Sequence, residues 1–194
     1  MDPIVVILAG GRGRRMGGNK PLFPYGETTL IEATLARLQP QTHRIVIDAG
    51  IAETPLAAEL AQLGWPLVFD QPPFDDLGPL SGVRTALAAA RNAGDDAVIT
   101  VPCDMPSLPL DFISRLTETG DEADIIHFTG ADDYRLCGLW RTTLLPALDK
   151  ALLAARPDGG LRVTSFLESK KLLKLPVVDD AAFRNINRPE DIAP

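Results

Sequence analysis

The sequence contains few cysteines, and it has no excess of positive charge. Cys103 and Cys137 are the only cysteines in 194 residues, and they form no C-x-x-C pair. These two features argue against a disulfide framework and against a cysteine zinc site. The formal net charge of −7, from 19 Lys and Arg against 26 Asp and Glu, argues against general nucleic-acid binding. We therefore expect both cysteines to be small buried residues.

Long hydrophobic runs are also missing. No apolar stretch reaches the roughly 18 residues of a membrane span, and no basic segment precedes the first apolar run. These absences predict a cytoplasmic protein without membrane contact. The chain has 45% hydrophobic and 23% charged residues, and it shows no repeat, low-complexity segment or linker. Its length is sufficient for one substantial core, so we expect a single domain over residues 1–194.

A strand and a glycine-rich loop near the start of the chain are the most informative stretch. The continuous apolar run from Ile4 to Ala9 predicts a strand that is buried on both faces. The loop that follows has the sequence Gly10-Gly11-Arg12-Gly13-Arg14-Arg15-Met16-Gly17-Gly18-Asn19-Lys20. Its glycines let main-chain N–H groups approach phosphate oxygens closely, while the arginines and the lysine supply positive charge. The stretch therefore predicts an anion-binding site.

Two common phosphate-binding motifs do not fit this loop. A P-loop needs Gly-Lys-Ser/Thr, but Asn19 separates Gly18 from Lys20, and Pro21 stands where the hydroxyl should be. A Rossmann fingerprint needs a third glycine at the position of Met16. A solvated Gly/Arg-rich turn is the alternative, but it does not account for strand, glycines, arginine and lysine in this order.

Beyond the loop, strands and helices alternate along the chain. A capping box at Thr29 and Glu32 predicts a helix to about Gln39, and Pro79 suits the first turn of a helix that Gly94 ends. Strands are predicted at 44–48, 67–70, 97–101, 124–128, 136–140 and 172–177, with further helices at 54–63, 110–118, 143–155, 162–168 and after 189. This order predicts an α/β fold with a doubly wound, mostly parallel sheet.

Several chemically active residues follow predicted strands. In an open parallel sheet, ligands bind beyond the carboxyl ends of the strands. The Gly10 loop, the segment Asp48-Ala49-Gly50, Asp70 and Asp104 all stand at such ends. A divalent ion that binds with a triphosphate needs one or two carboxylates, and Asp104 is the strongest candidate. An aspartate after a strand is also an ordinary turn residue.

The N-terminal stretch resembles the signature of nucleotidyltransferases, a strand followed by Leu-Ala-Gly-Gly-x-x-x-Arg-Met-Gly-x-x-Lys-x-Leu. The doubled glycines at 10–11 and 17–18 are similar to those of the molybdenum cofactor guanylyltransferases in particular. The resemblance continues in Pro102-Cys103-Asp104-Met105-Pro106, in the Gly78-Pro79-Leu80-Ser81-Gly82 segment and in the tail Asn185-Ile186-Asn187-Arg188-Pro189-Glu190-Asp191. It therefore spans nearly the whole chain.

The resemblance implies a Rossmann-like nucleotidyltransferase fold and a Mg²⁺-dependent reaction. GMP would pass from GTP to the terminal phosphate of molybdopterin, and pyrophosphate would be released. Proteins that insert molybdenum or mature molybdoenzymes are the candidate protein partners.

The resemblance also assigns roles to individual residues. Lys20, Arg15 and Asp104 would be catalytic, and Asp104 with Asn187 would bind the metal, although asparagines beside a proline are also good turn residues. Asp70 would accept hydrogen bonds from the N–H groups of guanine. The implied nucleotide-binding residues are Leu8, Ala9, Gly10, Gly11, Gly13, Lys20, Gly50, Asp70, Gly78, Pro79 and Asp104.

The chain departs from the family pattern at three places. The family often has asparagine at the position of Gly50 and aspartate at that of Asn19, and it has a His-Pro pair near Tyr134-Arg135-Leu136. The absence of the His-Pro pair leaves the identity of the acceptor substrate open. A cytidylyltransferase or another small-phosphate nucleotidyltransferase, which would share the fold and the glycine-rich loop, is one alternative, although cytidylyl enzymes usually have Leu-Ala-Ala-Gly. A non-catalytic accessory protein that binds the nucleotide or cofactor is another.

Overall fold

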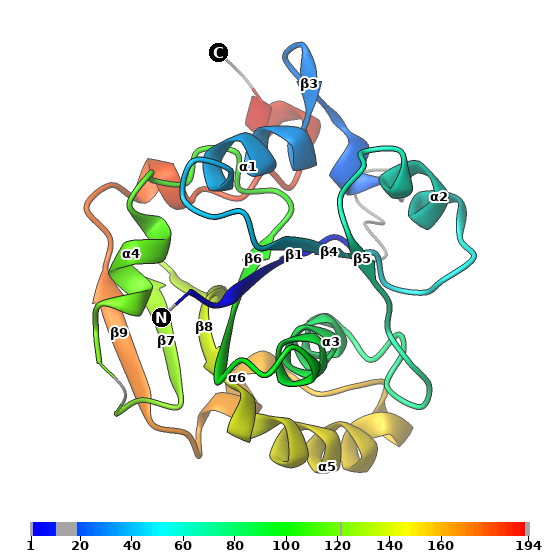
Figure 1. The fold of residues 1–194 in the computed structure, drawn as a ribbon, viewed down its shortest axis with the longest axis vertical. Coiled ribbons are helices and arrows are strands. Elements are labelled where there is room, and N and C mark those ends of the chain that lie inside the picture. The colour runs from blue at the N-terminus through cyan, green and yellow to red at the C-terminus, as the bar shows by residue number, and fades with distance from the viewer. Residues whose placement is uncertain (1, 11–18, 121, 193–194) are drawn as a thin grey trace.

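The structure, a computed structural model, describes residues 2–10, 19–120 and 122–192. A seven-stranded sheet with the order β5-β4-β1-β6-β8-β7-β9 forms its centre (Figure 1). The strands are β1 (Ile4–Leu8), β4 (Ile45–Asp48), β5 (Leu67–Val68), β6 (Ala97–Pro102), β7 (Ile125–Thr129), β8 (Asp133–Arg141) and β9 (Leu172–Pro176). Only β8 runs antiparallel to its neighbours. The predicted α/β class with a mostly parallel sheet is confirmed.

Helices cover both faces of the sheet (Figure 1). One face packs against α1 (Leu30–Leu38), α2 (Pro55–Ala61) and α4 (Phe112–Thr117). The other packs against α3 (Pro79–Asn92), α5 (Leu145–Ala155) and α6 (Val163–Leu167). Successive β1 residues serve opposite cores, since Val5 and Ile7 belong to the first and Val6 to the second. This division is the doubly wound arrangement that the sequence predicts.

Several local predictions are also confirmed. Thr29 and Glu32 form the capping box of α1, Pro79 begins α3, and Gly94 follows it with a φ of 81°. Both cysteines are buried and free. The described residues include no helix that is long and apolar enough to cross a membrane.

The sequence did not predict some short elements. A small hairpin of β2 (Pro24–Tyr25) and β3 (Thr28–Thr29) precedes α1. Short 3₁₀ helices occur at Lys20–Leu22, Thr142–Leu144, Arg156–Asp158, Asp180–Phe183 and Pro189–Ile192. The short final helix predicted from Pro189 is the last of these.

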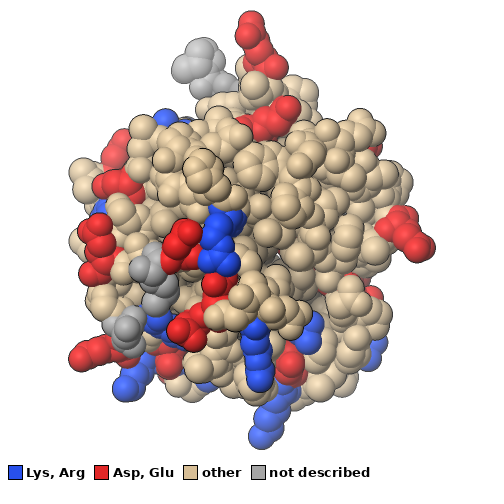
Figure 2. Space-filling model, in the orientation of Figure 1, with Lys and Arg blue, Asp and Glu red and all other residues tan. Residues whose placement is uncertain are grey.

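The face in Figure 2 carries charges of both signs. Its described acidic side chains lie along the edges and also near the centre, where basic side chains stand beside them. This face therefore presents no extended surface of one sign.

Candidate active site

Pairing of the central strands brings three segments together at one edge of the sheet. Leu8 at the end of β1 lies opposite Asp48 of β4 on one side and Pro102 of β6 on the other. The backbone pairing continues beyond the strands, because Ala9 N–H donates to the Asp48 carbonyl and Cys103 N–H donates to the Leu8 carbonyl. Asp104 therefore follows β6 directly beside the start of the Gly10 loop.

A cavity of about 940 Å³ opens at this edge. Eight of the residues predicted to bind nucleotide line it: Leu8, Ala9, Gly10, Lys20, Asp70, Gly78, Pro79 and Asp104. The residues come from five separate segments of the chain, and the fold unites them in one place. The predicted residues Gly11, Gly13 and Arg15 lie outside the described part of the chain.

Gly50 is not among the lining residues, and its backbone lies against that of Gly10. A Cβ atom on Gly10 would stand 2.3 Å from Gly50 Cα, and a Cβ on Gly50 would stand 2.7 Å from Gly10 Cα. The backbones that follow β1 and β4 therefore touch at these two glycines. Gly50 also has a φ of 71°, a conformation that side chains rarely adopt. Glycine at position 50 allows the close approach.

Lys20, Asp104 and Asn187 meet at one side of the cavity. Lys20 Nζ donates hydrogen bonds to Asp104 Oδ2 and, at 2.8 Å, to Asn187 Oδ1. Asp104 is only 5% exposed. More than eighty positions separate Lys20 from Asp104 and Asp104 from Asn187, yet the three residues form one polar cluster. It comprises a cation, a carboxylate and an amide.

Backbone contacts hold Asn187 in this cluster. Ile186 N–H donates to the Asp104 carbonyl at 3.0 Å, and the Ile186 side chain is buried against Leu30. The Asp191 carboxylate accepts hydrogen bonds from the backbone N–H groups of Asn187 and Arg188 at 2.8 and 2.9 Å. These bonds lower the pKa of Asp191 and keep it ionised. The tail is therefore tied both to the segment after β6 and to itself.

Asp70 and Asp48 are among the further aspartates that line the same cavity. Asp70 Oδ1 accepts a hydrogen bond from Thr85 Oγ1 at 2.5 Å, and Asp70 N–H donates to the Gly50 carbonyl. Burial raises the pKa of Asp70, an effect that the Thr85 hydrogen bond partly offsets. The Asp70 side chain is thus fixed at the cavity wall.

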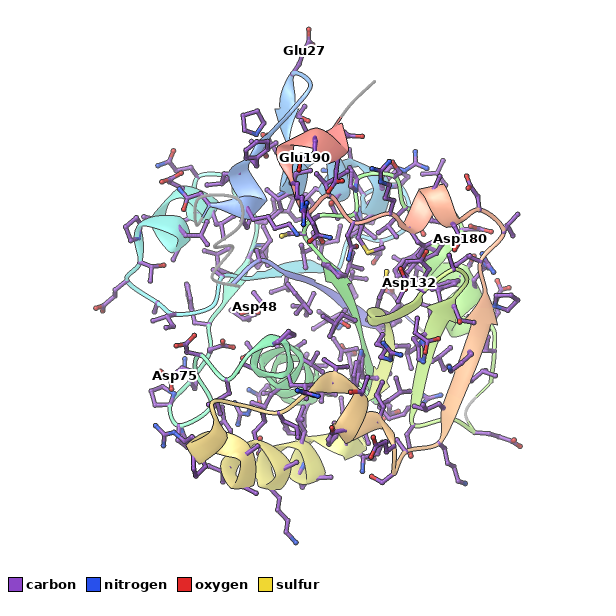
Figure 3. All side chains as sticks on the ribbon, turned by 180° about the vertical axis from the view of Figure 1, so that it is seen from behind. Glu27, Asp48, Asp75, Asp132, Asp180 and Glu190 are labelled. Atoms are coloured by element: carbon purple, nitrogen blue, oxygen red, sulfur yellow. The ribbon has the colours of Figure 1, made fainter. Side chains whose placement is uncertain are left out.

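Asp48 is the residue that the sequence-based site assignment missed. Its side chain lies between the sheet and α3 (Figure 3) and lines the cavity. Oδ1 accepts from Gly50 N–H at 3.0 Å, and a Cβ on Gly82 would stand 2.5 Å from Oδ2. Burial, with Asp70 nearby, raises the pKa of Asp48 to about 7. Asp48 was named only as the last residue of a predicted strand, and that position was the available signal.

A second cavity of about 670 Å³ adjoins the first. Pro102 and Leu136 line both cavities, so they form the shared wall. Asn187 lines the second cavity while it contacts Lys20 of the first. Asp132 and Asp180 lie on its far side, away from Asp48 (Figure 3). The Lys20–Asp104–Asn187 cluster therefore stands between two ligand-sized spaces.

The donor set of this cluster fits a divalent cation that arrives with a ligand. The described part of the chain contains no group of three or more His, Cys, Asp or Glu side chains that could hold a metal ion. One carboxylate and one amide oxygen are too few for a complete protein cage. Mg²⁺ commonly binds one or two carboxylates and takes its other ligands from phosphates and water. Asp104 and Asn187 match that pattern.

An open α/β sheet with Gly10, Lys20 and Asp104 at its carboxyl edge is the arrangement of a nucleotide-binding protein. The chain belongs to the family of MobA-like NTP transferase domains, whose model matches residues 5–171. It is 39% identical over 189 residues to a molybdenum cofactor guanylyltransferase of Cereibacter sphaeroides, covering 97% of this chain and 92% of the relative. A molybdenum cofactor guanylyltransferase of Cupriavidus metallidurans is 37% identical over 193 residues, covering 96% and 91%.

Solved structures support the same fold. The molybdopterin-guanine dinucleotide biosynthesis protein A of Archaeoglobus fulgidus superposes with a TM-score of 0.76 over 97% of this chain and 94% of its own, at 22% identity. The family resemblance inferred from the N-terminal signature is confirmed.

Proposed function

We propose that this protein transfers GMP from GTP to the terminal phosphate of molybdopterin, which forms molybdopterin guanine dinucleotide and releases pyrophosphate. The names of relatives at 37–39% identity support this activity. The observation that carries it is the Lys20–Asp104–Asn187 cluster, which stands between two adjoining cavities. One cavity would hold the nucleotide and the other the acceptor, so the reacting phosphates would meet at the cluster.

The larger cavity suits a guanine nucleotide. Guanine presents its N1–H and its amino group on one edge, and an ionised carboxylate accepts both. Asp70, fixed by Thr85, is the candidate acceptor for that edge. Leu8, Ala9 and Gly10 would contact the base and ribose through their backbone, and Gly78 and Pro79 would approach from the start of α3.

The smaller cavity suits the acceptor. It adjoins Asn187, and its lining includes Arg135 and Arg184 beside Asp132 and Asp180, so it offers both donors and acceptors to a polar ring system. The chain carries Tyr134-Arg135-Leu136 here in place of the family's His-Pro pair.

The transfer itself requires little proton chemistry. A phosphate monoester has a second pKa near ~6, so the acceptor oxygen is largely ionised at neutral pH. That oxygen would form a bond to the α-phosphorus of GTP, and the bond from α-phosphorus to the bridging oxygen would break, so pyrophosphate would leave with the electron pair. Catalysis then consists of positioning and charge stabilisation.

Each polar residue has a corresponding role in this scheme. Lys20 would neutralise the phosphates that leave, together with Arg15 and the backbone of Gly11 and Gly13. Asp104 and Asn187 would hold Mg²⁺, which when bound offsets negative charge on the phosphates. Biosynthesis in the cytoplasm, with handover to proteins that insert molybdenum or mature molybdoenzymes, is the matching cellular context.

Removal of the cluster's charged groups tests this assignment. We expect Lys20→Ala and Asp104→Ala to lower the rate of pyrophosphate release with GTP by about 100-fold or more, because each removes charge that acts on the reacting phosphates. Asp149→Ala, which removes a carboxylate paired with Arg84 away from the cluster, is the matched control and should retain activity. Near-normal rates for both cluster variants, with unchanged melting curves, would rule out this site.

A further inference from the structure

Lys20 contacts both side chains, those of Asp104 and Asn187, that would bind a metal ion in the proposed function. Its ammonium donates to the Asp104 carboxylate and to the amide oxygen of Asn187. Both oxygens also coordinate hard divalent cations well. The Lys20 ammonium and a divalent ion would therefore compete for the same two side-chain oxygens.

The contact between Lys20 and Asp104 compensates a buried carboxylate of the protein without nucleotide. Asp104 is 5% exposed, and a buried carboxylate is costly unless a cation or hydrogen bonds compensate it. Among the described residues, Lys20 forms an ion pair with it. The same ammonium also repels a divalent ion, since like charges at contact distance oppose each other strongly in a partly dry site.

A triphosphate offers Lys20 another partner. Lys20 lines the larger cavity, and it begins a short 3₁₀ helix directly after the glycine-rich segment. The flexible four-carbon stem of lysine allows its ammonium to turn from one anion to another without a backbone change. A triphosphate carries more negative charge than a single carboxylate, and it supplies the additional oxygen ligands that a divalent ion needs.

We propose that Lys20 acts as a built-in counterion that fills the metal position until nucleotide binds. The triphosphate draws the ammonium away, Asp104 and Asn187 become available, and the divalent ion enters between them and the phosphates. This inference rests on the proposed function and specifies how its site is loaded. Because coupling between two ligands is reciprocal, metal and nucleotide each strengthen the binding of the other.

Manganese binding without turnover tests the proposal. Mn²⁺ serves as the probe, its free concentration is measured by electron paramagnetic resonance, and the full chain is titrated with and without a non-hydrolysable GTP analogue. Lys20→Met keeps the length of the side chain and removes its charge. Lys174→Met is the matched control, because the same substitution removes a lysine that pairs with Asp133 instead.

We expect Lys20→Met to bind Mn²⁺ about tenfold or more tightly than the unmodified protein when no nucleotide is present, and Lys174→Met to change the affinity by less than about twofold. Mn²⁺ should also raise the melting temperature of Lys20→Met more than that of the unmodified protein. An affinity for Lys20→Met no greater than that for Lys174→Met would overturn the proposal.

The titration with the GTP analogue separates this proposal from the function it rests on. If the unmodified protein binds Mn²⁺ only with the analogue but Lys20→Met gains nothing, the counterion role alone is wrong. If no Mn²⁺ binds even with the analogue, both the counterion role and the metal-dependent transfer are wrong. Asp104→Asn should lose Mn²⁺ binding under both conditions.

Discussion

Asp48 illustrates how burial changes the chemistry of a single carboxyl group. Its pKa is raised from 3.8 to about 7, because burial and nearby Asp70 disfavour the charged form. Between these two values the folded protein retains a proton that the unfolded chain releases. The free energy of unfolding therefore falls as the pH rises through this range, and the loss is complete above about pH 7.

We expect Asp48→Asn to remove this dependence. The amide can keep the hydrogen bond from Gly50 N–H but cannot ionise. At about pH 8 the variant should exceed the unmodified protein in free energy of unfolding by the order of 1–4 kcal/mol, and at about pH 4 the difference should nearly vanish. Urea unfolding at both pH values measures this difference in free energy of unfolding. An equal difference at both would show that Asp48 does not titrate as described.

The close approach of Gly10 and Gly50 leads to a second prediction. Gly10→Ala would place a Cβ atom 2.3 Å from Gly50 Cα, so the two loops must separate. We expect the dissociation constant for GTP to rise about tenfold or more, equivalent to about 1.4 kcal/mol. Calorimetric titration measures it.

Gly64→Ala is the control for backbone strain. Gly64 has a φ of 75°, but a Cβ atom there would meet nothing within 4 Å beyond its chain neighbours. That variant should lose stability and bind GTP normally, whereas normal binding by Gly10→Ala would contradict the role of the close approach.

The sequence predicted the site residues better than their individual roles. Lys20, Asp70 and Asp104 follow recognisable strand ends or motifs, and all three line the cavity. Gly50 was expected to bind nucleotide and was noted as a departure from the family's asparagine, but its close approach to Gly10 was not predictable, since a contact between two backbones leaves no pattern in one sequence. The raised pKa of Asp48 depends on α3 and Asp70, which only the folded chain brings near.

At the scale of elements, the tail depends on an aromatic cluster for its position. Phe183 is 1% exposed, and its ring lies 4.7 Å from that of Phe128 and 5.1 Å from that of Tyr134, measured between centroids. This side chain joins the 3₁₀ helix Asp180–Phe183 to β7 and β8. It lies four residues before Asn187.

We therefore expect Phe183→Ala to affect both stability and activity. Loss of a buried phenyl ring should lower the free energy of unfolding by about 3–5 kcal/mol. Turnover should fall as well, even well below the melting temperature, because Asn187 loses its support. Val178→Ala, at a residue that is 91% exposed, should change neither. Full turnover by folded Phe183→Ala would show that Asn187 is held by other contacts.

Elements with local start signals were predictable from the sequence, whereas irregular strand pairing was not. The capping box of α1 and the proline of α3 are local signals that fix helix starts. By contrast, β8 was expected only at 136–140, and it extends from Asp133 to Arg141 across a register shift at His127 and Phe128 in β7. Such irregular pairing, like the two-residue strands β2 and β3, depends on the partner strand rather than on local periodicity.

At the scale of the whole molecule, the sheet order explains why the site lies where it does. Parallel β4, β1 and β6 bring Asp48, the Gly10 loop and Asp104 to one edge, and antiparallel β8 places the second cavity beside the first. The sequence predicted the first cavity through strand ends, whereas the second depends on the β7–β8 connection and the tail. In the proposed function, these two cavities bind GTP and a phosphate acceptor.

Pyrophosphate release with GTP, CTP and ATP in parallel, each with Mg²⁺ and molybdopterin, tests that claim most directly. We predict release with GTP alone, accompanied by a product whose mass equals the acceptor plus GMP. Release with CTP in place of GTP would contradict the guanine assignment centred on Asp70. The absence of pyrophosphate release with all three nucleotides would contradict the transfer itself and favour a protein that only binds its ligands.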